Sequence, residues 1–231
     1  MSARRVDVSS VRAGTAIHEI RAQPPYPVAM APRIWLIRHG ETEWSRTGRH
    51  TGSTDLPLTA RGEAAADAVR AELAGIHPAL TLCSPLRRAR DTAARAGLVP
   101  DEVTDDLREW DYGAWEGRTT AEIRATLGEA DWVVWNHRVP PGATPGEQLA
   151  DVGARVARVL DRCRPVLDDG QDCVLVAHGH VLRILTARWL GLPEGDGRLF
   201  ALDPARLSAL GFEHEQAVIS CWNSTSGPPA P

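Results

Sequence analysis

Two apolar segments of this 231-residue chain end in the same way, in a histidine followed by a glycine. Residues 34–40 read IWLIRHG and residues 174–179 read VLVAHG. A short apolar run without alternation is typical of a strand buried on both faces of a parallel sheet. Ligands of such sheets bind beyond the carboxyl ends of the strands. We therefore expect His39 and His178 to face one pocket, where Gly40 and Gly179 let the backbone approach a ligand.

Strands and helices alternate along most of the chain, and this alternation predicts the fold class. Apolar runs predict strands at 34–37, 80–83, 174–177, 207–212 and 217–222. Helices are expected at about 60–74 with Thr59 as N-cap, 84–96 with Ser84 as N-cap, 119–127, 129–137, 146–164 and 180–190. The pattern favours an α/β protein: a three-layer α/β/α sandwich with a mostly parallel central sheet and a short helical cap.

The chain is long enough for one domain with a well-buried core. Residues 1–30 show no period of 2 or 3.6 and end in a proline-rich stretch, so we interpret them as a flexible N-terminal extension. The domain is expected to span residues 31–223, with a cap at about 119–146. Residues 224–231, STSGPPAP, are predicted to be a disordered tail.

Composition excludes several classes of protein. A formal net charge of −4 provides no general basic field, so we expect no nucleic-acid partner. No apolar run approaches the roughly 20 residues of a membrane-spanning helix, so no membrane partner is expected either. All 26 basic residues are arginine, which rules out chemistry that depends on a lysine Schiff base or a phosphate-loop lysine.

The cysteines and histidines give no sign of a metal site. The four cysteines contain no CxxC pair and three of them lie in apolar stretches, which favours reduced thiols and a cytoplasmic location. His178 and His180 are close in sequence, but no matching set of carboxylates and histidines accompanies them. We therefore predict no metal and no cofactor.

Arginines accompany the first histidine and follow the Ser-Pro pair at 84–85. Arg38 directly precedes His39, and Arg87, Arg88 and Arg90 lie near the start of a predicted helix. Guanidinium groups at a helix N-terminus suit a phosphoryl group because of their fork geometry and the helix dipole. For Arg87 and Arg90 we favour the simpler interpretation that they form a solvated helix face.

Four segments in order carry a resemblance to a known family: IWLIRHGET (34–42), SPLRRARDTA (84–93), LREWDYGAWEG (107–117) and VLVAHG (174–179). Together they resemble the histidine phosphatase superfamily, the phosphoglycerate-mutase-like proteins, over about residues 32–222. The segments RHTGSTDLPLT (49–59) and EWDYGAWEG (109–117) look most like small bacterial acid phosphatases and fungal sugar-bisphosphatase relatives.

The resemblance implies a role for each matching residue. His39 would be the nucleophile that accepts the phosphoryl group, and Glu109 the acid and base that protonates the leaving oxygen and then activates water. Arg38, Arg88 and His178 would form the phosphate pocket. The positions expected to bind substrate are Ser45, Thr51, Gly52, Tyr112 and Gly179, with Ser45 standing where many members carry asparagine. Tyr112, Trp110 and Trp115 either line the substrate mouth or pack their loop.

The function that follows is a metal-independent phosphomonoesterase of the acid-phosphatase type. It would hydrolyse small phosphorylated metabolites, sugar phosphates among the candidates, through a phosphohistidine. The alternatives are a phosphoglycerate mutase and a non-catalytic phosphate-binding module. Hydrolysis is favoured because Glu109 and His178 are only 69 positions apart and the cap carries no lysine, only Arg118, Arg124 and Arg138 with Trp132 and Trp135. The resemblance also suggests a homodimer.

Overall fold

A six-stranded sheet runs through the computed structural model, which describes residues 31–224. The predicted extension at 1–30 and residues 225–231 of the predicted tail lie outside the described residues. The strand order is β3-β2-β4-β1-β5-β6. The strands are β1 (Ile34–Arg38), β2 (Leu80–Cys83), β3 (Glu102–Val103), β4 (Cys173–Ala177), β5 (Leu207–Glu213) and β6 (Gln216–Ser224). The first four strands are mutually parallel, β5 runs antiparallel to β1, and β6 runs antiparallel to β5, which confirms the mostly parallel sheet.

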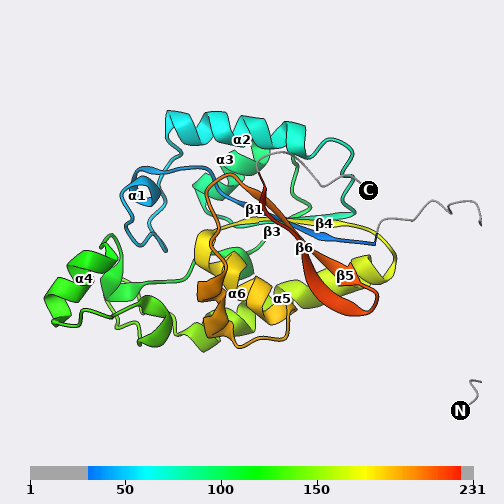
Figure 1. Cartoon of the computed structure of the whole chain (residues 1–231). Helices are drawn as coiled ribbons and strands as arrows, with labels where there is room; N and C mark the ends of the chain where they lie inside the picture. The colour runs from blue at the N-terminus through cyan, green and yellow to red at the C-terminus, as the bar shows by residue number, and fades with distance from the viewer. Residues whose placement is uncertain (1–30, 225–231) are drawn as a thin grey trace, which may run out of the picture. The chain divides into compact units, whose positions relative to one another are not determined.

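Helices cover both faces of the sheet, as Figure 1 shows. Helices α2 (Ala60–Glu72) and α3 (Arg87–Arg95) lie on one face, and α5 (Leu149–Asp168) and α6 (Gly179–Trp189) lie on the other. Two short helices, α1 (Glu43–Arg46) and α4 (Thr120–Leu127), lie away from these layers. The arrangement confirms the predicted three-layer sandwich.

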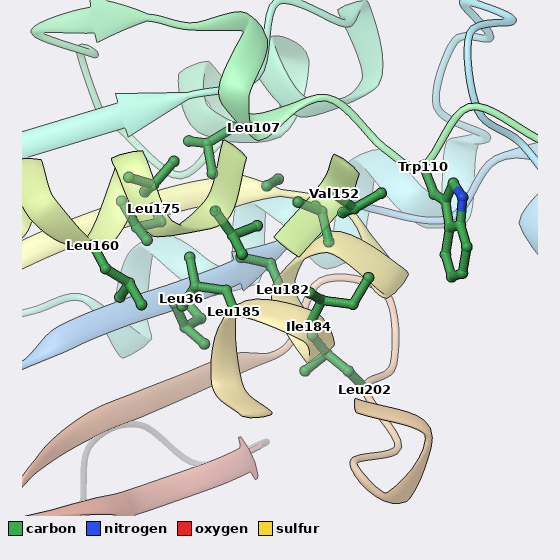
Figure 2. Packing of buried hydrophobic residues seen from close by; sticks show 14 of the residues in the cluster. Leu36, Leu107, Trp110, Val152, Leu160, Leu175, Leu182, Ile184, Leu185 and Leu202 are labelled. Atoms are coloured by element: carbon green, nitrogen blue, oxygen red, sulfur yellow. The ribbon is translucent and has the colours of Figure 1, made fainter. Parts of the chain in front are cut away.

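Successive residues of the central strands point to opposite faces and build two cores. Leu36 in β1, Leu82 in β2 and Leu175 in β4 are in register and share one core with residues of α5 and α6. Figure 2 shows Leu36 and Leu175 in this core. Their strand neighbours Trp35 and Val174 belong to the core beneath α2 and α3. Burial on both faces explains why these strands read as unbroken apolar runs.

The parallel pairing of β1 and β4 delivers both histidines to one edge of the sheet. The register runs from Ile34 opposite Cys173 to Arg38 opposite Ala177, and the His39 amide donates to the Ala177 carbonyl at 2.9 Å. On the other side of β4, the Ser84 amide donates to the Val176 carbonyl at 3.0 Å. Three strand ends therefore meet where the site forms.

Helix ends follow from local capping, with one prediction corrected. Thr59 accepts from the Gly62 amide at 3.0 Å as N-cap of α2, as predicted. Ser84 is not the N-cap of α3, because that helix begins at Arg87 with Leu86 in the capping position. The Ser84 hydroxyl instead accepts from the Leu86 amide at 3.3 Å, which forms a turn before the helix.

The cap region differs most from expectation. The predicted helix at 119–127 is present as α4, whose N-cap Thr119 and Glu122 form a capping box. The helix expected at 129–137 is absent, and only a 3-10 turn at Val134–Asn136 occurs there. Trp132 and Val134 are both buried, two positions apart, around an extended Val133. Alternating burial requires an extended backbone, so the tryptophans did not signal a helix.

We expect Leu175→Ala to destabilise the protein by about 2–5 kcal/mol, because Leu175 is fully buried in the middle strand and truncation leaves a cavity. Urea unfolding measures this change. Val99→Ala is the matched control, because Val99 is 86% exposed and its loss should stay within about 0.5 kcal/mol. Equal effects of the two substitutions would contradict the packing described here.

Candidate active site

His39 follows the last residue of β1 and is only 4% exposed. Its Nδ1 lies 2.7 Å from the Gly40 carbonyl oxygen. A carbonyl only accepts, so Nδ1 carries the proton and Nε2 holds the lone pair of the neutral ring. Burial, followed by the charges of Arg88 and Arg38, lowers the pKa of His39 well below 6.5. The ring is therefore neutral, with its proton on Nδ1 and a lone pair on Nε2.

His178 lies behind His39, with ring centroids 5.1 Å apart, and is fully buried. Its Nδ1 accepts from Arg88 Nε at 3.1 Å, so Nε2 carries the proton and donates to the Ser84 hydroxyl at 2.7 Å. Burial, followed by the charge of Arg88, lowers the pKa of His178 well below 6.5. Both ring nitrogens of His178 therefore have protein partners. Ser84, which was predicted to be a helix N-cap, is one of these partners.

Arg88 enters from the first turn of α3 and is fully buried. Besides His178, it donates to the carbonyl oxygens of Thr51, Gly52 and Thr54 at 2.9–3.1 Å. Four of the five N–H groups of the guanidinium are thus used to hold the 51–54 loop and the second histidine, which leaves one on Nη1. Arg87 and Arg90 on the same helix are exposed, in agreement with a solvated helix face.

Arg38 has a different environment from Arg88. Its Nη1 donates to the Leu202 carbonyl, and its Nε is buried without a hydrogen-bond partner among residues 31–224. A Cβ on Gly179 would lie 3.3 Å from that Nε, so glycine gives the guanidinium the room to lie across the start of α6. A buried cation with an unused N–H is a ready donor to an anion.

Glu109 reaches the N-terminus of α6 from the loop between β3 and α4 and is 8% exposed. Oε2 accepts from the His180 amide at 3.0 Å, and Oε1 accepts from the amides of Val181 at 3.0 Å and Trp110 at 2.9 Å. These bonds satisfy free amides in the first turn of α6. They also hold the carboxylate beside the histidine pocket.

A cavity of about 310 Å³ opens in front of these groups. Its walls include seven of the predicted residues: Arg38, His39, Ser45, Thr51, Glu109, Tyr112 and Gly179. Arg88, His178 and Gly52 are not on its walls and lie behind them. The structure therefore gathers all ten predicted residues in one region but divides them between a lining and a supporting layer.

Three of the predicted substrate-binding residues are held by contacts within the protein: Ser45 and Thr51 by hydrogen bonds, and Gly52 by close packing. The Ser45 hydroxyl accepts from the Thr42 amide at 2.8 Å and donates to the Thr42 carbonyl at 3.1 Å, which completes the cap of α1. The Thr51 hydroxyl donates to the Arg49 carbonyl at 3.0 Å. Gly52 has no room for a side chain, because a Cβ there would lie 2.4 Å from the Trp110 carbonyl oxygen.

The cavity is also lined by residues that were not among the predicted site residues. His50, Trp135, His180 and Arg183 line it together with Tyr112. Tyr112 Oη lies 2.5 Å from His180 Nδ1, and the His180 ring lies 4.8 Å from Trp135. Arg183 Cζ lies 4.8 Å from the centroid of the Trp135 ring.

His50 and His180 are adjacent in sequence to predicted site residues, and the tryptophans near the site differ in whether they line the cavity. His50 precedes Thr51 and His180 follows Gly179, so their neighbours were the available signal. Trp110 and Trp115 are buried in the core and do not line the cavity, so they pack the loop, whereas Tyr112 lines it. Arg183 and Trp135 had no motif to mark them.

Comparison with known proteins agrees with this geometry. Residues 34–225 match the family model of the histidine phosphatase superfamily (branch 1). The acid phosphatase of Mycobacterium tuberculosis is 39% identical over 203 residues, 85% of this chain and 94% of that protein. The sedoheptulose 1,7-bisphosphatase of Saccharomyces cerevisiae is 35% identical over 192 residues, 71% of this chain and 69% of that protein. Probable phosphoglycerate mutases also occur among the similar proteins.

A solved structure shows the same likeness in three dimensions. The structure of an open reading frame of M. tuberculosis has a TM-score of 0.77 at 39% identity, covering 83% of this chain and 97% of that one. The chain belongs to the histidine phosphatase superfamily. It is an enzyme of the phosphoric monoester hydrolase class, as its relatives named as phosphatases indicate.

Burial of neutral histidines predicts a loss of stability in acid. Burial lowers the pKa of His50 to about 4, whereas the unfolded imidazole binds a proton near pH 6.5. The unfolded chain therefore binds more protons below about pH 6.5, and the free energy of unfolding should fall by up to about 3 kcal/mol between pH 6.5 and 4 from this residue.

Urea unfolding at several pH values tests this, and His50→Gln should flatten the dependence over that range. His77→Gln, at an exposed histidine outside the site, is the control and should leave the slope unchanged. A slope that His50→Gln does not alter would contradict the neutral state of His50.

Proposed function

We propose that the chain is a metal-independent phosphomonoesterase that works through phosphohistidine at His39. One observation carries the proposal: the Gly40 carbonyl holds the proton on Nδ1 of His39, which leaves the Nε2 lone pair free beside a cavity that Glu109 also lines. A neutral, buried imidazole is a competent nucleophile toward phosphorus.

In the first step, the Nε2 lone pair of His39 attacks phosphorus and the bond to the leaving oxygen breaks. The electron pair of that bond stays on the leaving oxygen, which takes a proton from Glu109 and departs as an alcohol. Arg38, on the cavity wall, donates to the phosphoryl oxygens, and the helix start at Gly179 faces the same anion. The Gly40 carbonyl stabilises the positive charge of the phosphorylated ring through Nδ1–H.

In the second step, the Glu109 carboxylate removes a proton from water and the water oxygen attacks phosphorus. The P–N bond breaks and its electron pair returns to Nε2, which restores the neutral ring and releases phosphate. His178, Ser84 and Arg88 keep the surroundings of His39 in place during both steps through their mutual hydrogen bonds.

The residues that line the cavity around Tyr112 support a sugar phosphate as the substrate class. Trp135 offers an aromatic face, and the neutral rings of His50 and His180 offer hydrogen-bonding nitrogens. Burial, followed by the charge of Arg183, lowers the pKa of His180 well below 6.5, so this ring presents no charge of its own. Aromatic faces with neutral polar groups suit the apolar ring faces and hydroxyls of a sugar.

The proposal also covers the location of the protein, its oligomeric state and its independence of metal ions. Within residues 31–224, none of the helices is long and apolar enough to cross a membrane. We propose that the protein is cytoplasmic and forms a homodimer. In the same part of the chain, His, Cys, Asp and Glu side chains form no group of three that could hold a metal ion.

Trapping the intermediate tests the mechanism. Denaturing the enzyme during turnover of a radiolabelled phosphoester, without acid, should leave the label on His39, and His39→Ala should reduce the rate at least about 10³-fold. A chelator should leave turnover unchanged. Label on a serine or aspartate, or activity lost with the chelator, would overturn the proposed route.

The mutase is the second candidate, because mutase-like relatives occur, and product analysis separates it from the phosphatase. A mutase must exclude water from the phosphohistidine, and the short cap at 119–146 favours access of water. Supplied with 3-phosphoglycerate and 2,3-bisphosphoglycerate, the enzyme should release phosphate faster than it forms 2-phosphoglycerate. Faster isomer formation would make the mutase the better assignment.

A further inference from the structure

The segment that carries Glu109 belongs to no strand and, apart from 3-10 turns at Asp105–Leu107 and Gly113–Trp115, to no helix. Its backbone carbonyls therefore need partners from elsewhere. Arg155, in the middle of α5, supplies them. It is 6% exposed and donates to the carbonyl oxygens of Asp106 at 3.0 Å, Arg108 at 2.6 Å and Glu109 at 3.1 Å.

Arg155 is itself fixed by a bidentate ion pair with Glu147. Nε lies 2.8 Å from Oε1 and Nη2 lies 2.9 Å from Oε2. With the three carbonyls, this pair uses all five N–H groups of the guanidinium. Five bonds hold the planar guanidinium of Arg155 in one orientation, and the ammonium of a lysine could not make the same set of bonds.

Glu147 holds the other side of Glu109. Its Oε2 also accepts from the Asp111 amide at 3.0 Å, its carbonyl accepts from Trp110 Nε1 at 2.8 Å, and its own amide donates to the Asp111 carbonyl at 2.9 Å. The pair therefore forms hydrogen bonds with residues before and after Glu109. The carboxylate itself is held by α6, through His180 and Val181.

We propose that Arg155, held by Glu147, is a positioning residue that sets the place of the Glu109 carboxylate for proton transfer to the leaving oxygen. The inference rests on the proposed function, in which Glu109 is the acid. A buried ion pair is weak support for stability, since apolar replacements of similar volume often serve as well. A positioning role for Glu109 explains why Arg155 donates three hydrogen bonds to the segment that carries it.

The test uses leaving groups that differ in their need for a proton. Glu109→Gln should slow an alkyl phosphate far more than p-nitrophenyl phosphate, whose leaving group departs without protonation. If Arg155 positions Glu109, Arg155→Met should show the same selectivity: about 10–100-fold lower kcat on the alkyl phosphate and under about 3-fold on p-nitrophenyl phosphate, with similar KM.

Arg158→Met is the matched control, because Arg158 lies one turn further along α5 and contacts the same segment only through the Asp106 carboxylate, at 2.6 Å. It should leave both rates near the original values. The double variant Arg155→Met with Glu109→Gln should be no slower on the alkyl phosphate than Glu109→Gln alone, because the two changes remove one function.

The outcomes separate the two proposals. Equal losses on both substrates from Arg155→Met would show a general structural role and overturn the inference. Equal losses from Glu109→Gln would overturn the acid role, and the inference with it. If Arg155→Met does not fold, Glu147→Gln and Arg155→Lys replace it, and they must show the selective loss on the alkyl phosphate.

Discussion

The site depends on one interaction, the parallel pairing of β1 with β4. This pairing places the ends of two strands that are far apart in the sequence at one edge, and the His39 amide donates to the Ala177 carbonyl as the last bond of the ladder. Parallel strands point their carboxyl ends the same way, so each can deliver a histidine to the same place. The strand β2 adds Ser84 and α3 adds Arg88 at that edge.

Backbone and side-chain partners fix the two histidines in opposite tautomers. A carbonyl holds the proton on Nδ1 of His39, whereas a guanidinium, which can only donate, forces the proton of His178 onto Nε2. The first ring is left with a free lone pair and the second with none. Two residues that follow equivalent strands in the sequence therefore differ in chemistry because their neighbours differ.

The sequence predicted the central strands because apolar runs are local signals, and the strand-end motifs pointed to residues that the fold brings into one region. It failed where the structure depends on distant contacts. Ser84 precedes a proline and looked like an N-cap, but its hydroxyl pairs with His178, which lies far along the chain. Trp132 and Val134 were predicted to be helical, but Val133 between them is extended and only a 3-10 turn follows it. Arg155 lies within α5, and only the fold reveals that its guanidinium contacts the segment that carries Glu109.

The two buried arginines divide the work of handling charge. Arg88 uses four of its N–H groups on protein partners, whereas the buried Nε of Arg38 has no hydrogen-bond partner among residues 31–224. Both lower the pKa of His39, but burial is the larger cause. A bound phosphoryl group would offset the arginine charges, and their repulsion of a proton on the ring would weaken. Burial does not depend on the charge of a bound ligand, so the depth of the pocket is the larger cause of the neutral state of His39.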